Sequence, residues 1–284
     1  MTDDKKLKPN ISEKSPKSHY QDNEQPRNLK TKPSAAAVVD RKAFLSALEL
    51  RLAEIGENLT VVQQEKMADY YQILVETNRV MNLTGIVEAA EVAEKHIADS
   101  LRLLPYLREM QETKADQPLT LVDVGTGAGL PGVPLAVACP GLQVFLLESQ
   151  QKRCNFLKKV IEQIHLNNAE IIRGRAEELG NNEKYREKLD FAVARAVASM
   201  PILLEYLAPF VRIGGKIVAM KGSNIEEEMV KSQNARKELA LTVDSEIQYQ
   251  LHSGEQRSLV ILTKNNLLKK KYPRNSGAIK KKPL

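Results

Sequence analysis

The 284-residue sequence has no tryptophan, few aromatic residues of any kind and only two cysteines, Cys139 and Cys154. The cysteines lack the close spacing of zinc ligands, and so small a number fits a reducing compartment; we expect both to be buried thiols on helices. No apolar stretch is long enough to span a bilayer, and no charged-then-apolar start resembles a signal peptide. These absences argue against a membrane protein and predict a cytoplasmic one.

Acidic residues are absent from the C-terminal end of the chain. Residues 264–284 hold eight Lys and Arg and no Asp or Glu, a net charge of +8, whereas residues 1–40 carry +2 and residues 41–263 carry −4. The basic excess therefore lies in the two ends. We predict a basic tail at residues 265–284, either solvated and flexible or in contact with a polyanion. Tyr272 and Pro273 are unusual in a solvating tract and predict, as an alternative, that the tail docks on the domain.

The first part of the chain changes from polar to helical near residue 40. Residues 1–39 are polar with scattered prolines, which predicts a disordered extension. Residues 40–117 are predicted to be an N-terminal helical region with three helices. The first begins after Asp40 as N-cap, the second after a capping box of Thr60 and Gln63, and the third spans about 88–104.

From residue 118 to 264, short apolar runs alternate with helical patterns. Runs that are apolar on both faces favour parallel strands covered by helices on both sides. A helix is predicted at about 224–238, and the last two runs, near 242–251 and 257–264, are close enough to form an antiparallel hairpin. Five parallel strands closed by a hairpin predict an α/β, Rossmann-like, mostly parallel seven-stranded sheet of the class I methyltransferase type. The five runs lie at residues 120–124, 143–148, 170–174, 189–194 and 215–220.

A glycine-rich turn follows the first of these strands, in the sequence LTLVDVGTGAGLPG (119–132). Gly127, Gly129 and Gly132 match the G-x-G-x-x-G pattern of dinucleotide-binding turns. Asp123 with the glycines that follow it matches equally well the D-x-G-x-G-x-G pattern of turns that bind S-adenosylmethionine. The turn therefore predicts a nucleotide-like ligand, and the glycines alone leave its identity open.

Asp123 favours S-adenosylmethionine over a dinucleotide. A pyrophosphate on the first helix needs positive potential, which a carboxylate two residues before the first glycine opposes. S-adenosylmethionine has no phosphate and carries an ammonium and a sulfonium, so a carboxylate is favourable there, either directly or by bracing the turn. Glu148, at the end of the second strand, can accept both ribose hydroxyls of either cofactor.

The chain lacks the signatures of enzymes that need a base or a nucleophile on the methyl acceptor. ARAVAS (194–199) stands where amino-group methyltransferases carry [DN]-P-P-[FYW], and Cys154 is in the wrong place for a cytosine-C5 nucleophile. Guanine N7 has a free lone pair, and its methylation needs alignment and electrostatics alone. The alternatives are an NAD-dependent oxidoreductase and a non-catalytic RNA-binding protein on the same scaffold.

A set of short segments, in this order and spacing, resembles the glucose-inhibited division protein B family from about residue 43 to the C-terminus. That family consists of bacterial guanine-N7 methyltransferases of small-subunit (16S) ribosomal RNA, and the resemblance implies this activity, this substrate and S-adenosylmethionine as cofactor. We also expect a monomer. The segments are NLTGI (82–86), KHIADS (95–100), DVGTGAGLPGVPLA (123–136), RAEEL (175–179), ARAVAS (194–199), AMKG (219–222) and KKYPRNSG (270–277).

The resemblance also implies which residues form the site. Arg195 corresponds to an arginine at the junction of cofactor and substrate and is predicted to be catalytic; its alternative is an ordinary ion pair. Lys221, at the end of the fifth strand, is predicted either to meet substrate phosphate or to cap the sheet. The implied cofactor contacts are Gly125, Gly127, Leu130, Glu148, Ala176, Glu177 and Arg195.

His96 and Asp99 lie three residues apart on a predicted helix and share a face. Two such groups are half of a metal site, but no third ligand is evident. We therefore expect a hydrogen-bonded structural pair and no metal.

Overall fold

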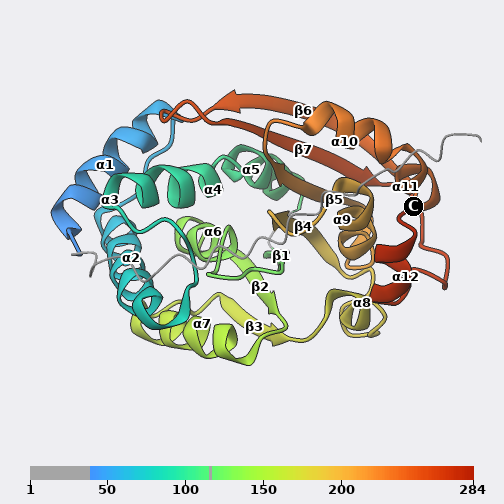
Figure 1. Cartoon of the computed structure of the whole chain (residues 1–284), viewed down its shortest axis with the longest axis horizontal. Helices are drawn as coiled ribbons and strands as arrows, with labels where there is room; N and C mark the ends of the chain where they lie inside the picture. Colours follow the sequence, from blue (N-terminus) through green and yellow to red (C-terminus); the bar gives the residue numbers. More distant parts are fainter. Residues whose placement is uncertain (1–38, 115–116) are drawn as a thin grey trace, which may run out of the picture. The chain divides into compact units, whose positions relative to one another are not determined.

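A computed structural model describes residues 39–114 and 117–284, which belong to one structural unit (Figure 1). The disordered extension predicted for residues 1–39 lies, apart from Val39, outside the described residues. No helix of the described part is long and apolar enough to cross a membrane.

All the regular secondary structure between residues 39 and 114 is helical, and local sequence signals start two of these helices. Asp40 caps α1 by accepting from the Ala43 amide at 2.8 Å, and the Thr60–Gln63 capping box begins α2, as predicted. The helix predicted over 88–104 is wrong as a single α-helix. Its middle is a π-helix, η1, and a further helix, α5, was not predicted. The elements are α1 Arg41–Glu54, α2 Val61–Met81, α3 Ala89–Glu91, η1 Val92–Ala98, α4 Asp99–Leu101 and α5 Leu104–Thr113.

The second part of the chain is a seven-stranded sheet in the order β3-β2-β1-β4-β5-β7-β6. β1 to β5 pair in parallel, whereas β7 is antiparallel to both β5 and β6. The predicted strands and hairpin are confirmed. The strands are β1 Leu119–Val124, β2 Leu142–Glu148, β3 Ala169–Arg173, β4 Leu189–Arg195, β5 Val211–Lys221, β6 Leu241–Gln250 and β7 Gln256–Lys264.

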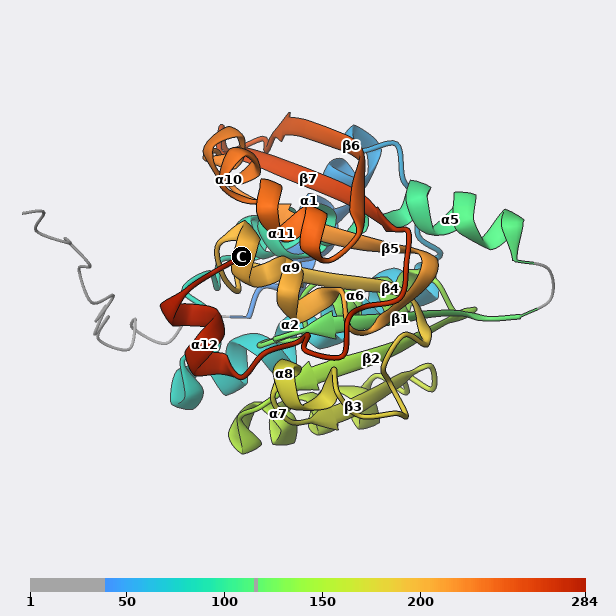
Figure 2. The same ribbon diagram turned by 90° about the vertical axis from the view of Figure 1, so that its right-hand side faces the viewer.

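Two apolar cores sandwich the sheet, because neighbouring residues of the central strands point to opposite faces. Leu121 and Phe191 pack with the N-terminal helices, whereas Val122 and Ala192 pack against α9 and the C-terminal residues (Figures 1 and 2). Burial on both faces is the pattern expected of a parallel sheet. The helices after β1 are α6 Gly132–Ala138, α7 Gln151–Gln163, α8 Ala176–Leu179, α9 Met200–Leu207, α10 Ile225–Lys231, α11 Gln233–Glu238 and α12 Ser276–Lys281.

Two further predictions about helices need correction. The helix expected at 224–238 is two short helices, α10 and α11, that meet at Ser232. Cys154 is a buried thiol on α7, as expected, but Cys139 is the residue that ends α6 and is only partly buried. The chain turns at Cys139 towards β2, which leaves its side chain at the edge of the core.

The basic C-terminal residues pack on the domain. This is the alternative predicted from Tyr272 and Pro273, in which the tail docks. Leu268, Tyr272 and Ile279 are buried in the core beneath α9. Arg274 pairs with Glu205, a carboxylate with no solvent exposure, at 2.6 Å. Residues 265–284 are therefore a docked segment with apolar anchors of its own.

Candidate active site

A cleft of about 380 Å³ opens at the carboxyl ends of β1, β2 and β4. Ligands of open α/β sheets bind at this edge, where the strand order reverses on either side of β1. Five of the predicted site residues line it together, whereas Gly127, Leu130 and Lys221 lie outside its lining. The five are Gly125, Glu148, Ala176, Glu177 and Arg195.

The glycine turn enters the cleft directly after β1. The amides of Gly125 and Thr126 both donate to the Leu147 carbonyl, at 2.9 and 3.1 Å, which ties the turn to the end of β2. Gly125 has φ +70°, and a Cβ added there would lie 3.1 Å from a Val197 methyl. A side chain at position 125 would therefore strain the backbone and enter the cleft beside Val197.

Asp123 braces the turn from beneath. Its Oδ2 accepts hydrogen bonds from the Gly132 amide at 2.8 Å and the Thr126 hydroxyl at 2.6 Å. Burial raises the pKa of Asp123 to about 6, although these two hydrogen bonds oppose the shift. Its other oxygen, Oδ1, is buried and has no hydrogen-bond partner among the described residues. A buried carboxylate oxygen without a donor favours a nearby cation and opposes a nearby phosphate.

The N-terminal helices hold the same turn from the other direction. The Tyr70 hydroxyl, on α2, donates to the Ala128 carbonyl at 2.7 Å. Burial raises the pKa of Tyr70, so it remains a neutral donor. Leu130 is buried in the core shared with these helices, and its contact with the cofactor stays a prediction.

Glu148 is a nearly buried carboxylate at the end of β2. It accepts from the Gln150 amide at 2.8 Å and from the Gly127 amide at 3.2 Å, and Arg153 lies 3.6 Å away. Gly127 therefore acts through Glu148, which its N–H helps to orient. These contacts fix a hydrogen-bond acceptor on the cleft surface, as recognition of hydroxyl groups requires.

Arg195, at the end of β4, is oriented by the N-terminal region. Its Nη1 donates to the Lys95 carbonyl at 2.8 Å and lies 3.3 Å from Asp99 Oδ2. Asp99 is 2 % exposed, and its second oxygen accepts from the Tyr249 hydroxyl at 2.7 Å. Burial and the neighbouring Asp99 raise the pKa of Tyr249, which keeps it a donor. Arg195 is thus both a member of an ion pair and a residue of the cleft.

The π-helix coincides with this network. Lys95 and His96 lie within η1, and Asp99 follows it, with its amide bonded to the Glu94 carbonyl five residues back. Wide turns of this kind are frequent at functional sites. Here the carbonyl that Arg195 contacts belongs to the wide turn.

The predicted hydrogen bond between His96 and Asp99 needs correction. The recorded side-chain partner of His96 is Thr84, whose hydroxyl lies 2.9 Å from His96 Nε2, while Asp99 pairs with Arg195 and Tyr249. Burial, and secondarily Arg195, lower the pKa of His96 to about 3, so it is neutral. Among the described residues no three His, Cys, Asp or Glu side chains gather as a potential metal site.

Lys221 is engaged by the protein itself. Its Nζ donates to the Ala198 carbonyl and pairs with Glu228, each at 2.6 Å, and Glu228 also accepts from the Met200 amide at 2.7 Å. Lys221 therefore holds the loop between β4 and α9, which lines the cleft. The contact with substrate phosphate stays a prediction.

Several cleft residues were missed by sequence reasoning. Arg153 and Arg175 stand near predicted site residues, and Arg175 directly precedes Ala176 in a segment already singled out, so its position was a usable signal. Ser276 and Lys280 also line the cleft. Nothing local in the sequence predicts their position, because it depends on how the C-terminal segment docks.

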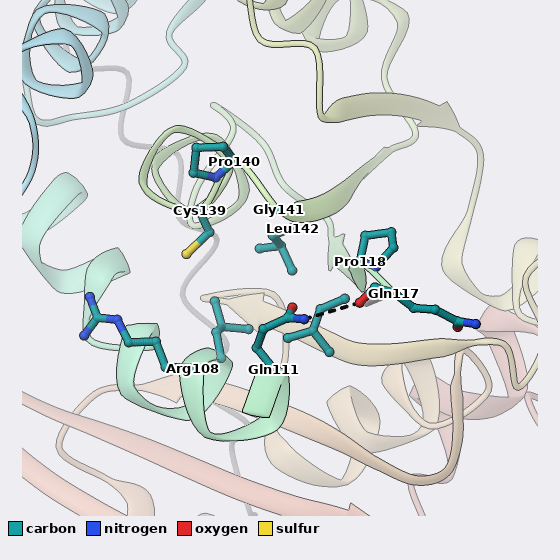
Figure 3. Close-up of a pocket in the computed structure, with 10 residues that line it drawn as sticks. Arg108, Gln111, Gln117, Pro118, Cys139, Pro140, Gly141 and Leu142 are labelled. Atoms are coloured by element: carbon teal, nitrogen blue, oxygen red, sulfur yellow. Dashed lines mark hydrogen bonds between the residues drawn. The ribbon is translucent and has the colours of Figure 1, made fainter. Parts of the chain in front are cut away.

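A second hollow, of about 480 Å³, lies at the opposite edge of the sheet (Figure 3). Leu107 and Gln111 of α5 form one side, and the chain from Cys139 to Leu142 forms another. The amino ends of β1 and β2 lie at this hollow. The glycine turn lies at the other end of β1, after its last residue. The site of a nucleotide-like ligand is therefore the cleft at the carboxyl edge.

Comparisons with known proteins agree with the cleft. The family model for GidB, rRNA small subunit methyltransferase G, matches residues 63–260. "Ribosomal RNA small subunit methyltransferase G" of Leuconostoc citreum is 41% identical over 243 residues, which cover 86% of this chain and 98% of that protein. The protein of the same name from a Thermoanaerobacter species is 43% identical over 232 residues, with 81% and 94% covered.

A solved structure agrees on the fold alone. It comes from Klebsiella pneumoniae, and its assignment as an O-methyltransferase is provisional. It covers 78% of this chain and 97% of its own, with 14% identity and a TM-score of 0.50. This agreement supports the overall fold described above.

Proposed function

We infer that this chain, which belongs to the rRNA small subunit methyltransferase G family, methylates N7 of a guanine in small-subunit (16S) ribosomal RNA with S-adenosylmethionine as methyl donor. The observation that carries the proposal is the glycine turn on the carboxyl edge of the sheet with its two buried carboxylates, Glu148 in the lining of the cleft and Asp123 behind the turn. They suit a ligand with hydroxyls and positive charge and oppose one with a pyrophosphate. The NAD-dependent alternative loses its support for this reason.

The residues of the cleft fit S-adenosylmethionine. Glu148 is oriented to accept hydrogen bonds from ribose hydroxyls, and Ala176 and Glu177 line the part assigned to adenine by family resemblance. The unpartnered Asp123 Oδ1 favours the cationic end of the ligand near the glycine turn. When bound, S-adenosylmethionine supplies an electrophilic methyl group.

The protein's own part in the reaction is to align and to exclude water. Among the described residues that line the cleft there is no histidine, cysteine or aspartate. An acceptor with a free lone pair, such as guanine N7, needs none of them. Arg195 keeps its guanidinium at the cleft through Lys95 and Asp99, and in this proposal it positions the target guanine beside the cofactor. The enzyme acts as a monomer in the cytoplasm, where its RNA substrate is assembled into ribosomes.

The cofactor assignment is tested by calorimetry on the Glu148→Gln variant. We expect the wild type to bind S-adenosylmethionine and not NAD. The variant should bind it more weakly by about 1–1.5 kcal/mol for each ribose hydrogen bond, because a bond to a charged acceptor becomes a bond to a neutral amide. Glu170→Gln is the matched control, since Glu170 lies on β3 and pairs with Lys184 away from the cleft. NAD binding by the wild type would overturn the cofactor assignment.

The substrate assignment is tested in the same preparation. Wild-type protein, S-adenosylmethionine and small-subunit ribosomal RNA from a deletion strain should give 7-methylguanosine, detected by mass spectrometry of the nucleosides. Methylation of another atom would contradict the N7 assignment. Tight cofactor binding without methyl transfer to RNA or subunits would favour the non-catalytic alternative.

A further inference from the structure

The C-terminal helix α12 places a lysine, Lys280, at the cleft. Ser276 and Lys280 line the same cleft as Ala176 and Tyr206. Helix α12 lies beside α9, on the face of the sheet away from the N-terminal helices (Figure 2). Lys280 is therefore next to the cofactor site although it comes more than 80 residues after Arg195.

The position of α12 is held firmly. Tyr272 is buried, and its carbonyl accepts from Arg186 at 2.8 Å while its hydroxyl donates to Glu238 at 2.9 Å. Arg274 contacts the buried carboxylate of Glu205 through both Nε and Nη2. Asn275 then caps α12 by accepting from the Ala278 amide at 2.9 Å. The side chains of α12 consequently keep a defined place relative to the cleft.

The basic residues of this segment fall into two groups. Lys269 and Lys271 pair with Glu238, and Arg274 pairs with Glu205. In contrast, the side chains of Lys280, Lys281 and Lys282 are exposed, and in the described part of the chain they have no recorded hydrogen bond or ion pair. The paired cations neutralise acids of the domain, whereas three of the four exposed lysines without a partner in residues 265–284 are at or just after α12; the fourth, Lys270, lies before it.

We propose that α12 is a contact surface for the substrate RNA, in which Lys280, with Lys281 and Lys282, binds phosphates of the strand that leads into the cleft. The inference rests on the proposed function. S-adenosylmethionine has no phosphate, a single carboxylate and a net positive charge, so a cluster of three lysines exceeds what the cofactor could pair with. RNA carries a phosphate at every nucleotide, and residues 41–263 have a net charge of −4, which makes local cations necessary for attraction.

The experiment compares two full-length variants that differ only in which lysines are lost. Lys280→Ala/Lys281→Ala/Lys282→Ala removes the unpaired charges, and Lys269→Ala/Lys270→Ala/Lys271→Ala removes three charges from the same segment. Binding of deproteinised small-subunit ribosomal RNA is measured across a salt series with S-adenosylmethionine present. For single-stranded contacts each neutralised phosphate contributes about 0.7 to the slope, so the α12 variant should lose roughly 2 units of slope and about 100-fold in affinity at 0.1 M salt.

The control variant should keep the greater part of the wild-type slope, because two of its three lysines are occupied by Glu238. Calorimetry should show unchanged S-adenosylmethionine affinity in both variants, and thermal melting should show that both are folded. Equal slopes for wild type and the α12 variant would overturn the proposal while leaving the methyltransferase assignment intact. Loss of cofactor affinity with an unchanged RNA slope would also overturn it. Absence of methyl transfer by the wild type would instead count against the proposed function.

Discussion

The cleft has two sides that are built by different physical means. The glycine-turn side, residues 123–130, is held by buried hydrogen bonds: Asp123 to Gly132 and Thr126, and Tyr70 to Ala128. The C-terminal side, residues 268–281, is held by acids of the domain that pair with basic residues, with Glu205 and Arg274 at its centre. The glycine-turn side directly follows the central strand β1 of the sheet. The C-terminal side is formed by the last segment of the chain, which packs on the domain.

In our proposals the glycine-turn side binds the cofactor and the C-terminal side contacts the substrate. Contacts hidden from water respond little to salt, whereas exposed charges are screened. The glycine-turn side should therefore keep its geometry in any buffer in which the protein is folded. The C-terminal side combines one buried pair, which fixes it, with exposed lysines whose contribution depends on ionic strength. The predictions below address the two sides in order of expected effect.

The largest effect is expected at Arg195, which ties the end of β4 in the cleft to the N-terminal helices. Arg195→Ala should lower the single-turnover rate of methyl transfer by about 100-fold or more, because a small misplacement of the reacting groups is enough for such a loss. The measurement is quench-flow or manual sampling of 7-methylguanosine at saturating cofactor and RNA. Arg195→Lys keeps the charge but lacks the planar guanidinium, and it should recover only part of the rate.

Arg212→Ala is the matched control for Arg195. Arg212 also pairs with a buried carboxylate, Asp190 at 2.8 Å, but at the amino-terminal edge of the sheet. Both variants should lose stability, and the Arg212 variant alone should keep its rate per folded molecule. If both variants lose the same fraction of the rate, the role of Arg195 is only that of a structural ion pair.

The C-terminal side is tested for stability by Arg274→Ala. Glu205 has no solvent exposure and Arg274 is 23% exposed, so removing the arginine leaves a buried carboxylate without its charged partner. Such a change costs about 3 kcal/mol, measured as the free energy of unfolding in urea. Lys269→Ala, which breaks a pair with an exposed lysine, should cost less than about 1 kcal/mol.

A double variant makes the reason for that loss testable. Glu205→Leu/Arg274→Met replaces the buried pair by apolar side chains and should recover much of the stability that Arg274→Ala loses. A double variant as unstable as Arg274→Ala would show that the shape of the arginine, and not the unpaired carboxylate, is what the segment requires.

The smallest effect is a pH dependence on the glycine-turn side. The folded pKa of Asp123 is about 6, above its ordinary 3.8, so folding favours the protonated form. The stabilisation from this group is fully present below pH 3.8 and is lost as the pH rises through 6. Relative to Asp123→Asn, the wild type should gain about 2 kcal/mol of unfolding free energy between pH 7 and pH 4. Parallel pH curves for the two proteins would show that the pKa is not raised.

Patterns confined to neighbouring residues predicted the structure well. The Thr60–Gln63 capping box depends on contacts within a few residues. The strands and the hairpin were predicted from short apolar runs that alternate with helical patterns, and all are confirmed. The glycine turn and Asp123 could likewise be recognised in one stretch of sequence, 119–132. The single helix predicted over 88–104 was wrong, because apolar spacing does not reveal a turn widened where a distant arginine bonds to it.

The sequence by itself determined the fold class, the family and the place of the cofactor turn, since each of these depends on short segments and their order. Only the tertiary structure decided the partners of those segments. Arg195 meets Asp99 from 96 residues earlier, Asp99 meets Tyr249 from 150 residues later, and Lys280 reaches the cleft only because Arg274 and Tyr272 are anchored on the domain. The physical reason is that buried charges and hydroxyls take whichever partner the packed core brings within hydrogen-bond distance, and sequence separation does not restrict that choice.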